Sequence, residues 1–323
     1  MKITIHRGIN QIGGCITEIS TATSRIFIDM GDNLPGNGKE MSEEEKAAFV
    51  GSLFQDTDKE VAVFYTHYHG DHVGLSQHVP EGIQQYIGKV AKQVMLVKAK
   101  VLKEDTDRIN AYKTYDVAKA IKIGDIVVKP FLVSHSACDA YMFLVEADGK
   151  KILHSGDYRN HGYIGKGLKD FVSKYIGQVD YLITEGTMLS RTSEKVLTEG
   201  ELKSQAHRLM KDNKYNFVIC SSTDIDRLAT FYNARPKGYL FVCDTYQAEV
   251  LNVFTHENGT HADLYKFIDV DAFPDNTLLD RMLAQGFCMM VRPNDKSKSK
   301  YQAFTELAIR KCKNYKQVFY SMW

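Results

Sequence analysis

Residues 66–74 read THYHGDHVG, and this stretch places His67, His69, Asp71 and His72 within six positions. The whole chain has 11 histidines among 323 residues, so three of them in one loop is a marked concentration. Imidazole nitrogens and carboxylate oxygens are ligands that suit zinc. In an extended loop His67 and His69 point the same way, and Asp71 and His72 follow on the next turn. Two offset pairs of ligands suit two metal ions about 3.5–4 Å apart.

A two-metal site needs further ligands from elsewhere in the chain, and two residues are candidates. His135 lies in LVSHS just after a predicted strand, and Asp157 lies in LHSGDYR just after another. Either residue alone is typical of an ordinary turn at a strand end. Because the histidine cluster also follows an apolar strand, VAVFY at 61–65, the three segments together predict one metal site at the ends of several strands.

The elements that must position these residues are mainly strands. Alternating apolar residues predict strands over 1–6 and 15–20, and SRIFIDMGD gives a third. Further strands are predicted over 61–65, 126–133, 140–146, 151–155 and 181–186, and the first and last of these are expected to be buried. Ser42 with Glu45 three residues later is a capping-box start, which predicts a helix over 42–54.

Beyond residue 195 the pattern changes to alternating helices and strands. Helices are predicted over TEGELKSQAHRLMKDN, TDIDRLATFYNA and TYQAEVLNVF, and strands over NFVICSS, YLFVCD and GFCMMVRP. This alternation predicts a second domain of βαβ type with a small parallel sheet. The chain stops on the strand-like run KQVFYSMW, from which we expect the second domain to be incomplete at its C-terminus.

Composition narrows the class of protein. Hydrophobic residues make up 44% of the chain and charged residues 25%, which is typical of a soluble globular protein. The net charge of +1 favours neither a nucleic-acid partner nor its absence. Six scattered cysteines without a C-x-x-C pair argue against a cysteine zinc site and favour a cytoplasmic protein. No apolar run approaches the roughly 20 residues of a membrane span.

The pattern H-x-H-x-D-H, followed by a lone histidine and then by GD, resembles the metallo-β-lactamase superfamily. The resemblance implies an α/β fold, an αββα sandwich with two metal ions at one edge of its sheets. It also implies a zinc-activated hydroxide as the nucleophile. The ligands that it implies are His67, His69 and His135 for one zinc ion, and Asp71, His72 and Asp157 for the second, with Asp157 bridging both. Manganese is the alternative metal.

The same resemblance assigns supporting residues. IFIDMGD resembles the first motif of the superfamily, in which Asp29 orients the metal loop without binding metal. His154 lies beside the strand that delivers Asp157 and is expected to support the site or to be purely structural. Asp71 is a candidate proton shuttle as well as a ligand.

The second domain indicates a branch of the superfamily. VDYLITEGT, a helix and then FVICSSTDIDRLATFY resemble the ribonuclease J-like branch, which carries a β-CASP domain. The resemblance implies a metallo-β-lactamase domain over 1–192, a β-CASP-like domain over 193–323 and cleavage of phosphodiester bonds in single-stranded RNA or DNA. Glu185 would be the acidic residue of this branch, acting in proton transfer or simply ending a strand. The candidate phosphate-binding residues are Arg159, Ser221, Ser222 and Arg227, with N-capping as the alternative role of the serines.

One ligand of the second metal is missing. The superfamily supplies a final histidine well downstream, and the candidates here are His161, His207, His256 and His261, none of which has a convincing context. Two alternatives therefore stay open. One is a hydrolase of the same fold acting on a small ester, thioester or lactone, and the other is a chain that binds metal or nucleic acid without turnover. A homo-oligomer is compatible with either.

Overall fold

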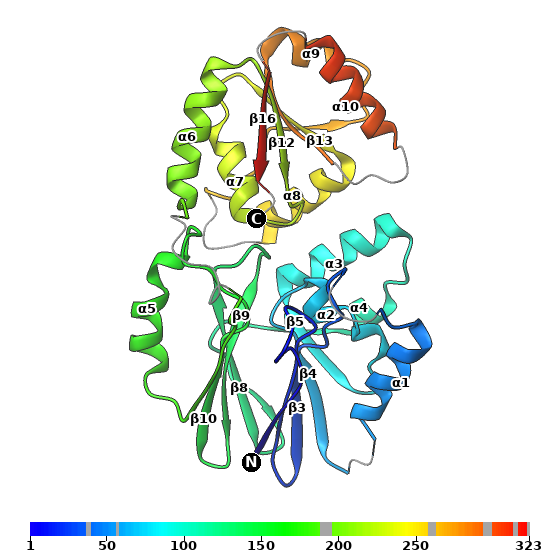
Figure 1. The fold of residues 1–323 in the computed structure, drawn as a ribbon, viewed down its shortest axis with the longest axis vertical. Helices are drawn as coiled ribbons and strands as arrows, with labels where there is room; N and C mark the ends of the chain where they lie inside the picture. The colour runs from blue at the N-terminus through cyan, green and yellow to red at the C-terminus, as the bar shows by residue number, and fades with distance from the viewer. Residues whose placement is uncertain are drawn as a thin grey trace. The chain divides into compact units, whose positions relative to one another are not determined.

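The computed structural model describes residues 1–36, 40–55, 58–187, 196–257, 263–292, 299–312 and 316–321. The chain forms two compact units, drawn in Figure 1. Unit 1 comprises Met1–Asn160 and Ile164–Glu194, and unit 2 comprises His161–Tyr163 and Lys195–Trp323.

Unit 1 contains a six-stranded sheet in the order β1-β2-β3-β4-β5-β6. Its strands are β1 (Lys2–Arg7), β2 (Ile16–Ser20), β3 (Ser24–Ile28), β4 (Glu60–Phe64), β5 (Gln84–Gly88) and β6 (Lys113–Tyr115). The first three strands pair antiparallel, and β3 to β6 pair parallel. The helices α1 (Glu43–Leu53), α3 (Lys89–Leu102) and α4 (Asp107–Ala111) lie beside this sheet (Figure 1).

A second sheet of unit 1 has five strands in the order β11-β10-β9-β8-β7. They are β7 (Ile121–Ile123), β8 (Ile126–Val133), β9 (Ala140–Ala147), β10 (Lys150–His154) and β11 (Tyr181–Ile183). Four of them form an antiparallel meander, and β11 joins β10 in parallel at the edge. The helix α5 (Leu168–Phe171) continues as a π-helical segment over Val172–Ile176.

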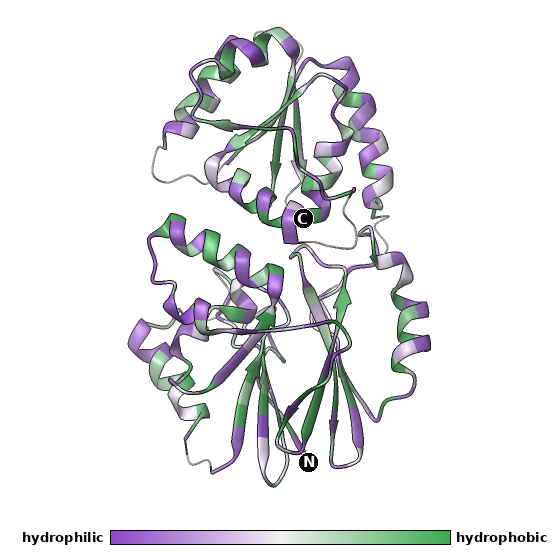
Figure 2. Ribbon diagram, turned by 180° about the vertical axis from the view of Figure 1, so that it is seen from behind, coloured by the Kyte–Doolittle hydropathy of each residue, from purple (hydrophilic) through white to green (hydrophobic). Residues whose placement is uncertain are grey.

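The main core of unit 1 lies between its two sheets, where apolar strand residues appear in Figure 2 as green bands. Ile26 and Phe64 of the first sheet are fully buried together with Phe143 and Val145 of the second. On the other face of the second sheet, Phe131 packs edge-on against Phe171 of α5. Helices outside two packed sheets give the αββα sandwich, so the predicted fold class is confirmed.

Unit 2 contains a parallel sheet in the order β14-β13-β15-β12-β16. The strands are β12 (Tyr215–Cys220), β13 (Leu240–Asp244), β14 (Val270–Phe273), β15 (Phe287–Met290) and β16 (Lys316–Ser321). The helices are α6 (Glu199–Asp212), α7 (Ile225–Ala234), α8 (Thr245–Glu257), α9 (Leu278–Gln285) and α10 (Lys300–Lys311). The small parallel sheet that the alternating pattern predicted is therefore present.

Helix α1 begins where the sequence predicted, but strand β11 is more exposed than the sequence predicted. Ser42 caps α1 through the predicted box with Glu45. Strand β11 was expected to be buried, but Tyr181 is 46% exposed and Leu182 60% exposed. That prediction is wrong because β11 lies at the edge of its sheet.

Among the described residues, the helices are too short or too polar to cross a membrane.

Candidate metal centre

The loop that carries the histidine cluster begins directly after β4. A short helix, α2 (Gly70–Val73), carries Asp71 and His72. The backbone N–H of Cys15 donates to the carbonyl of Asp71 at 3.0 Å, and the N–H of Met30 donates to the carbonyl of His72 at 2.8 Å. The segments directly before β2 and after β3 therefore fix the turn on which these two side chains sit.

Three histidines converge at one end of this loop. The ligand atoms of His67, His69 and His135 lie within 4.8 Å of one another, and His69 Nδ1 is 3.3 Å from His135 Nε2. Burial keeps the pKa of His67 well below its ordinary value and lowers the pKa of His135 to about 3. Both rings are therefore neutral at physiological pH and offer a lone pair to a metal ion.

His67 shows most clearly that a ligand is expected. Its Nε2 is buried and has no hydrogen-bond partner among the described residues. Its Nδ1 lies 3.0 Å from the hydroxyl of Thr66. The Thr66 hydroxyl donates to the carboxylate of Asp29 at 2.8 Å, so it accepts the proton of His67 Nδ1. This chain of contacts leaves the Nε2 lone pair free, as a metal ligand requires.

A second group lies on the other side of His67. The ligand atoms of His67, His72 and Asp157 fall within 4.8 Å of one another. His72 Nε2 is 3.3 Å from Asp157 Oδ2 and 3.7 Å from Asp71 Oδ2. Asp157 Oδ2 is also 3.8 Å from His135 Nε2, so this carboxylate lies between the two groups. Burial opposes ionisation of Asp157, but His72 outweighs it and lowers the pKa of Asp157 to about 2.

Asp29 holds His72 as well as Thr66. It is fully buried, and its Oδ2 lies 2.7 Å from His72 Nδ1. The same carboxylate accepts the backbone N–H of Thr66 at 2.7 Å. A proton on His72 Nδ1 therefore points at Asp29, and Nε2 faces Asp157 and Asp71. Asp29 adopts a left-handed backbone conformation with φ 64°, which is uncommon for a residue other than glycine.

The loops that deliver the later residues are tied together. The N–H of Arg159 donates to the carbonyl of Ser134 at 2.7 Å, which links the Asp157 loop to the His135 loop. The N–H of Tyr158 donates to the carboxylate of Glu185 at 2.8 Å. Burial raises the pKa of Glu185, and the nearby charge of Asp157 raises it further. The charge of Arg159 acts on His135 and contributes to its lowered pKa, so Arg159 lies near this group.

Two more side chains support the site from within unit 1. His154, at the end of β10, is buried, and its Nδ1 accepts the N–H of Gly156 at 3.2 Å. Burial lowers the pKa of His154. Tyr68, between two of the histidines, accepts the N–H of Cys138 at 2.9 Å and packs edge-on against His69. Sequence reasoning missed Tyr68 and Thr66, although a hydroxyl residue directly before the first histidine was a usable signal.

The remaining predicted residues belong to unit 2. Arg227 is buried and forms an ion pair with Glu199 at 3.0 Å, which argues against its predicted phosphate contact. Asp224, and neither Ser221 nor Ser222, caps α7. The alternative capping role of the serines is therefore wrong.

The candidates for a final ligand remain without a place in either group. His207 Nδ1 contacts the carbonyl of Ala234 at 2.8 Å. His161 belongs to unit 2, His256 lies on α8, and His261 is outside the described residues. Among the residues that the structure describes, neither group includes a histidine from beyond Asp157.

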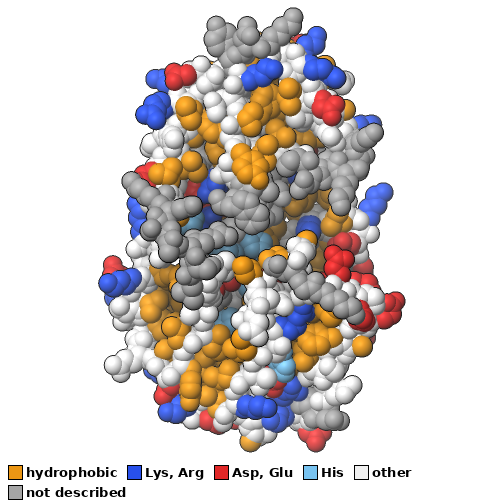
Figure 3. Space-filling model, viewed as in Figure 1, with side chains coloured by type: hydrophobic (Ala, Val, Ile, Leu, Met, Phe, Trp, Pro, Cys, Tyr) orange, Lys and Arg blue, Asp and Glu red, His pale blue; other side chains and the backbone are white. Residues whose placement is uncertain are grey.

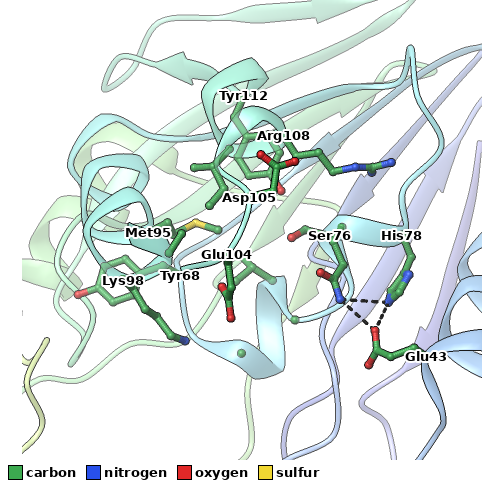
Figure 4. A pocket seen from close by; sticks show the side chains of 16 residues that line it. Glu43, Tyr68, Ser76, His78, Met95, Lys98, Glu104, Asp105, Arg108 and Tyr112 are labelled. Atoms are coloured by element: carbon green, nitrogen blue, oxygen red, sulfur yellow. Dashed lines mark hydrogen bonds and ion pairs between the residues drawn. The ribbon is translucent and has the colours of Figure 1, made fainter. Parts of the chain in front are cut away.

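A pocket of about 660 Å³ lies behind the metal loop, between α2, α3 and α4. Figure 4 shows Tyr68, Met95, Lys98, Glu104 and Tyr112 among the side chains that line it. None of the six predicted metal ligands lines this pocket. The pocket is therefore distinct from the metal groups, although its lining residue Tyr68 packs against His69.

Comparisons with known proteins agree with this geometry. No family model matches the chain. Ribonuclease J of Helicobacter pylori (strain ATCC 700392 / 26695) is 22% identical over 289 residues, which are 86% of this chain and 42% of the relative. Ribonuclease J of Mycoplasma genitalium is 29% identical over 170 residues, which are 49% of this chain and 28% of the relative. The chain thus spans less than half the length of the curated relatives it matches.

A solved structure shares the fold. A protein of unknown function from Enterococcus faecalis V583 superposes with a TM-score of 0.73 at 19% identity, over 99% of this chain and 88% of that one. The sandwich with its histidine and aspartate groups, the parallel sheet of unit 2 and the ribonuclease J relatives point to one assignment. The chain is similar in sequence to ribonuclease J, and it has the sandwich and the histidine and aspartate groups expected of the β-CASP branch of the metallo-β-lactamase superfamily.

Proposed function

We propose that the chain is a metal-dependent nuclease that hydrolyses phosphodiester bonds of single-stranded RNA, with single-stranded DNA as the alternative substrate. The observation that most strongly supports this proposal is the pair of ligand groups that share His67. Asp157 lies between His72 of one group and His135 of the other. The names of the relatives support RNA as the substrate. The free cysteines among the described residues support a cytoplasmic protein.

The donor set fits zinc, and manganese is the alternative. His67, His69 and His135 would hold one ion, and Asp71, His72 and Asp157 would hold the second. When bound, such ions supply Lewis acidity and lower the pKa of water toward neutrality. The orphaned Nε2 of His67 and the neutral ring of His135 support this assignment.

The remaining roles belong to the side chains of the chain itself. Asp29 and Thr66 orient His72 and His67 by the hydrogen bonds described above. Glu185 holds the Asp157 loop, and its raised pKa suits proton transfer to a leaving oxygen. Asp71 is a second candidate for that transfer, and burial raises its pKa too. Arg159 would bind a phosphate oxygen near His135.

Unit 2 would bind nucleic acid in this proposal. We propose that residues 1–192 are the metallo-β-lactamase domain and residues 193–323 the β-CASP-like domain. Ser221 and Ser222 follow β12 and remain candidate phosphate contacts, whereas Arg227 is a weaker candidate because Glu199 already pairs with it.

The direct test combines a metal assay with a cleavage assay on the purified chain. Two zinc ions per chain and cleavage of a 5′-monophosphorylated RNA are expected. Hydrolysis of a thioester, ester or lactone without RNA cleavage would replace the nuclease by a small-molecule hydrolase. Binding of metal or RNA without turnover of any of these substrates would instead indicate the non-catalytic alternative.

A further inference from the structure

The loop of residues 8–14, GINQIGG, lies directly against a metal-site carboxylate. A Cβ atom added at Gly13 would meet Asp71 Cβ at 2.7 Å and Asp71 Oδ2 at 2.8 Å. Gly13 also has φ +77°, which a side chain would disfavour. The backbone of this loop therefore forms one wall beside Asp71, although the proposed chemistry assigns the loop no role.

The loop is held in place by its own polar contacts. Gln11 Nε2 donates to the carbonyl of Gly13 at 3.1 Å and to Asn33 Oδ1 at 2.9 Å. Gly13 and Asn33 also form an isolated β-bridge. Asn33 follows β3, whose end carries Asp29, so the loop and the metal loop share one support. A loop fixed in this way can position a bound group.

The side chains that this loop exposes are apolar. Ile12 is 49% exposed and Ile9 is 67% exposed. Ile12 precedes Gly13 directly, so its Cα lies about 3.8 Å from that of the residue packed on Asp71. Hydrophobic side chains come to the surface at several places in Figure 3, and an isolated one needs no explanation. Ile9 and Ile12 place two exposed apolar side chains on the one fixed loop whose Gly13 packs on Asp71.

We propose that Ile12, assisted by Ile9, is a positioning residue for the sugar and base of the nucleotide next to the scissile phosphate. This inference rests on the proposed nuclease function and adds the part of the substrate that the metal groups do not contact. The ligands and Arg159 engage phosphate, whereas a nucleoside offers an apolar face that every base shares. Contact with that face tolerates any sequence and places the phosphate at the metal groups.

The test compares Ile12→Ser with Leu102→Ser, which removes a similarly exposed apolar side chain at the end of α3. RNA binding is measured by fluorescence anisotropy with a labelled single-stranded ten-mer. Turnover is measured with the same RNA and with methyl p-nitrophenyl phosphate, which has no base. Ile12→Ser should raise the Kd and KM for RNA about five- to tenfold, with kcat and the small-substrate rate within about twofold.

Two further results complete the design. Leu102→Ser should match the wild type in every assay, and Ile12→Val should restore RNA binding because it keeps an apolar side chain. Unchanged RNA binding by Ile12→Ser would overturn the inference, as would an equal loss of rate on both substrates, since the loop would then merely support Asp71. A wild-type chain that neither binds nor cleaves RNA would instead reject the proposed function, and the inference with it.

Discussion

The carboxylate of Asp29 lies 2.7 Å from Nδ1 of His72, and this contact decides which nitrogen of His72 faces the metal groups. Asp29 is fully buried at the end of β3, whereas His72 sits on the turn after β4. One residue therefore sets the tautomer of a ligand 43 positions away in the sequence.

Asp29→Asn tests this relationship. An amide at this position can donate to His72 Nδ1 and reverse the tautomer, which directs the ring proton toward Asp157. Affinity for the second metal equivalent should fall by about 10–100-fold, while the three-histidine group keeps its ion. Isothermal titration of the metal-free protein with zinc measures both steps. Two unchanged binding steps would show that Asp29 does not orient His72.

Thr66 offers a second test that acts through His67. Thr66→Val keeps the shape of the side chain but removes the hydroxyl that joins His67 Nδ1 to Asp29. Zinc affinity of the three-histidine group should fall by about tenfold. Loss of a donor to the buried Asp29 should also lower the free energy of unfolding by about 1–3 kcal/mol. Thr66→Ser, which retains the hydroxyl, is the control and should stay close to the wild type.

Gly31 tests how closely β3 braces the metal loop. A Cβ atom here would lie 1.8 Å from the backbone oxygen of Asp71, which cannot move without displacing the loop. Gly31→Ala should therefore lower both the free energy of unfolding, by about 1–3 kcal/mol or more, and the metal content. Gly51→Ala on α1 meets no atom within 4 Å and should stabilise the chain by about 0.5–1 kcal/mol. Urea unfolding of both variants distinguishes packing at the loop from a general effect of alanine.

The dependence of stability on pH can be tested away from the metal groups, at Glu18. Burial opposes ionisation of Glu18, but hydrogen bonds from His6 and Arg25, each 2.8 Å long, lower its pKa from 4.5 to about 2. Because the folded-state pKa is the lower one, this stabilisation is complete above about pH 4.5 and is lost as the pH falls toward 2. Glu18→Gln removes it at every pH.

Urea unfolding of the wild type and Glu18→Gln between pH 6 and pH 3 measures this effect. The difference in free energy of unfolding between the two should be largest at pH 6 and should narrow as the pH falls. A difference that stays constant over this range would show that Glu18 does not titrate with a lowered pKa.

The sequence predicted the site where the information is local. The spacing of the histidine cluster and the apolar strands before His135 and Asp157 were enough to predict that these residues lie close together, as the two groups around His67 do. The contacts of Thr66, Gly13 and Gly31 depend on tertiary packing between segments that no local pattern relates. The exposure of β11 was mispredicted because its short apolar run resembles that of a buried strand, and its place at the sheet edge depends on tertiary packing. No helix or strand was predicted from the sequence pattern of residues 84–123, although β5, α3, α4, β6 and β7 lie there.

Anomalous diffraction at the zinc edge, from crystals of the zinc-loaded chain, tests the central claim most directly. We predict two peaks about 3.5–4 Å apart. One should lie about 2.0–2.1 Å from ring nitrogens of His67, His69 and His135, and the other beside His72, with Asp157 between them. No peak at these residues, or zinc bound elsewhere on the chain, would contradict the two-metal account.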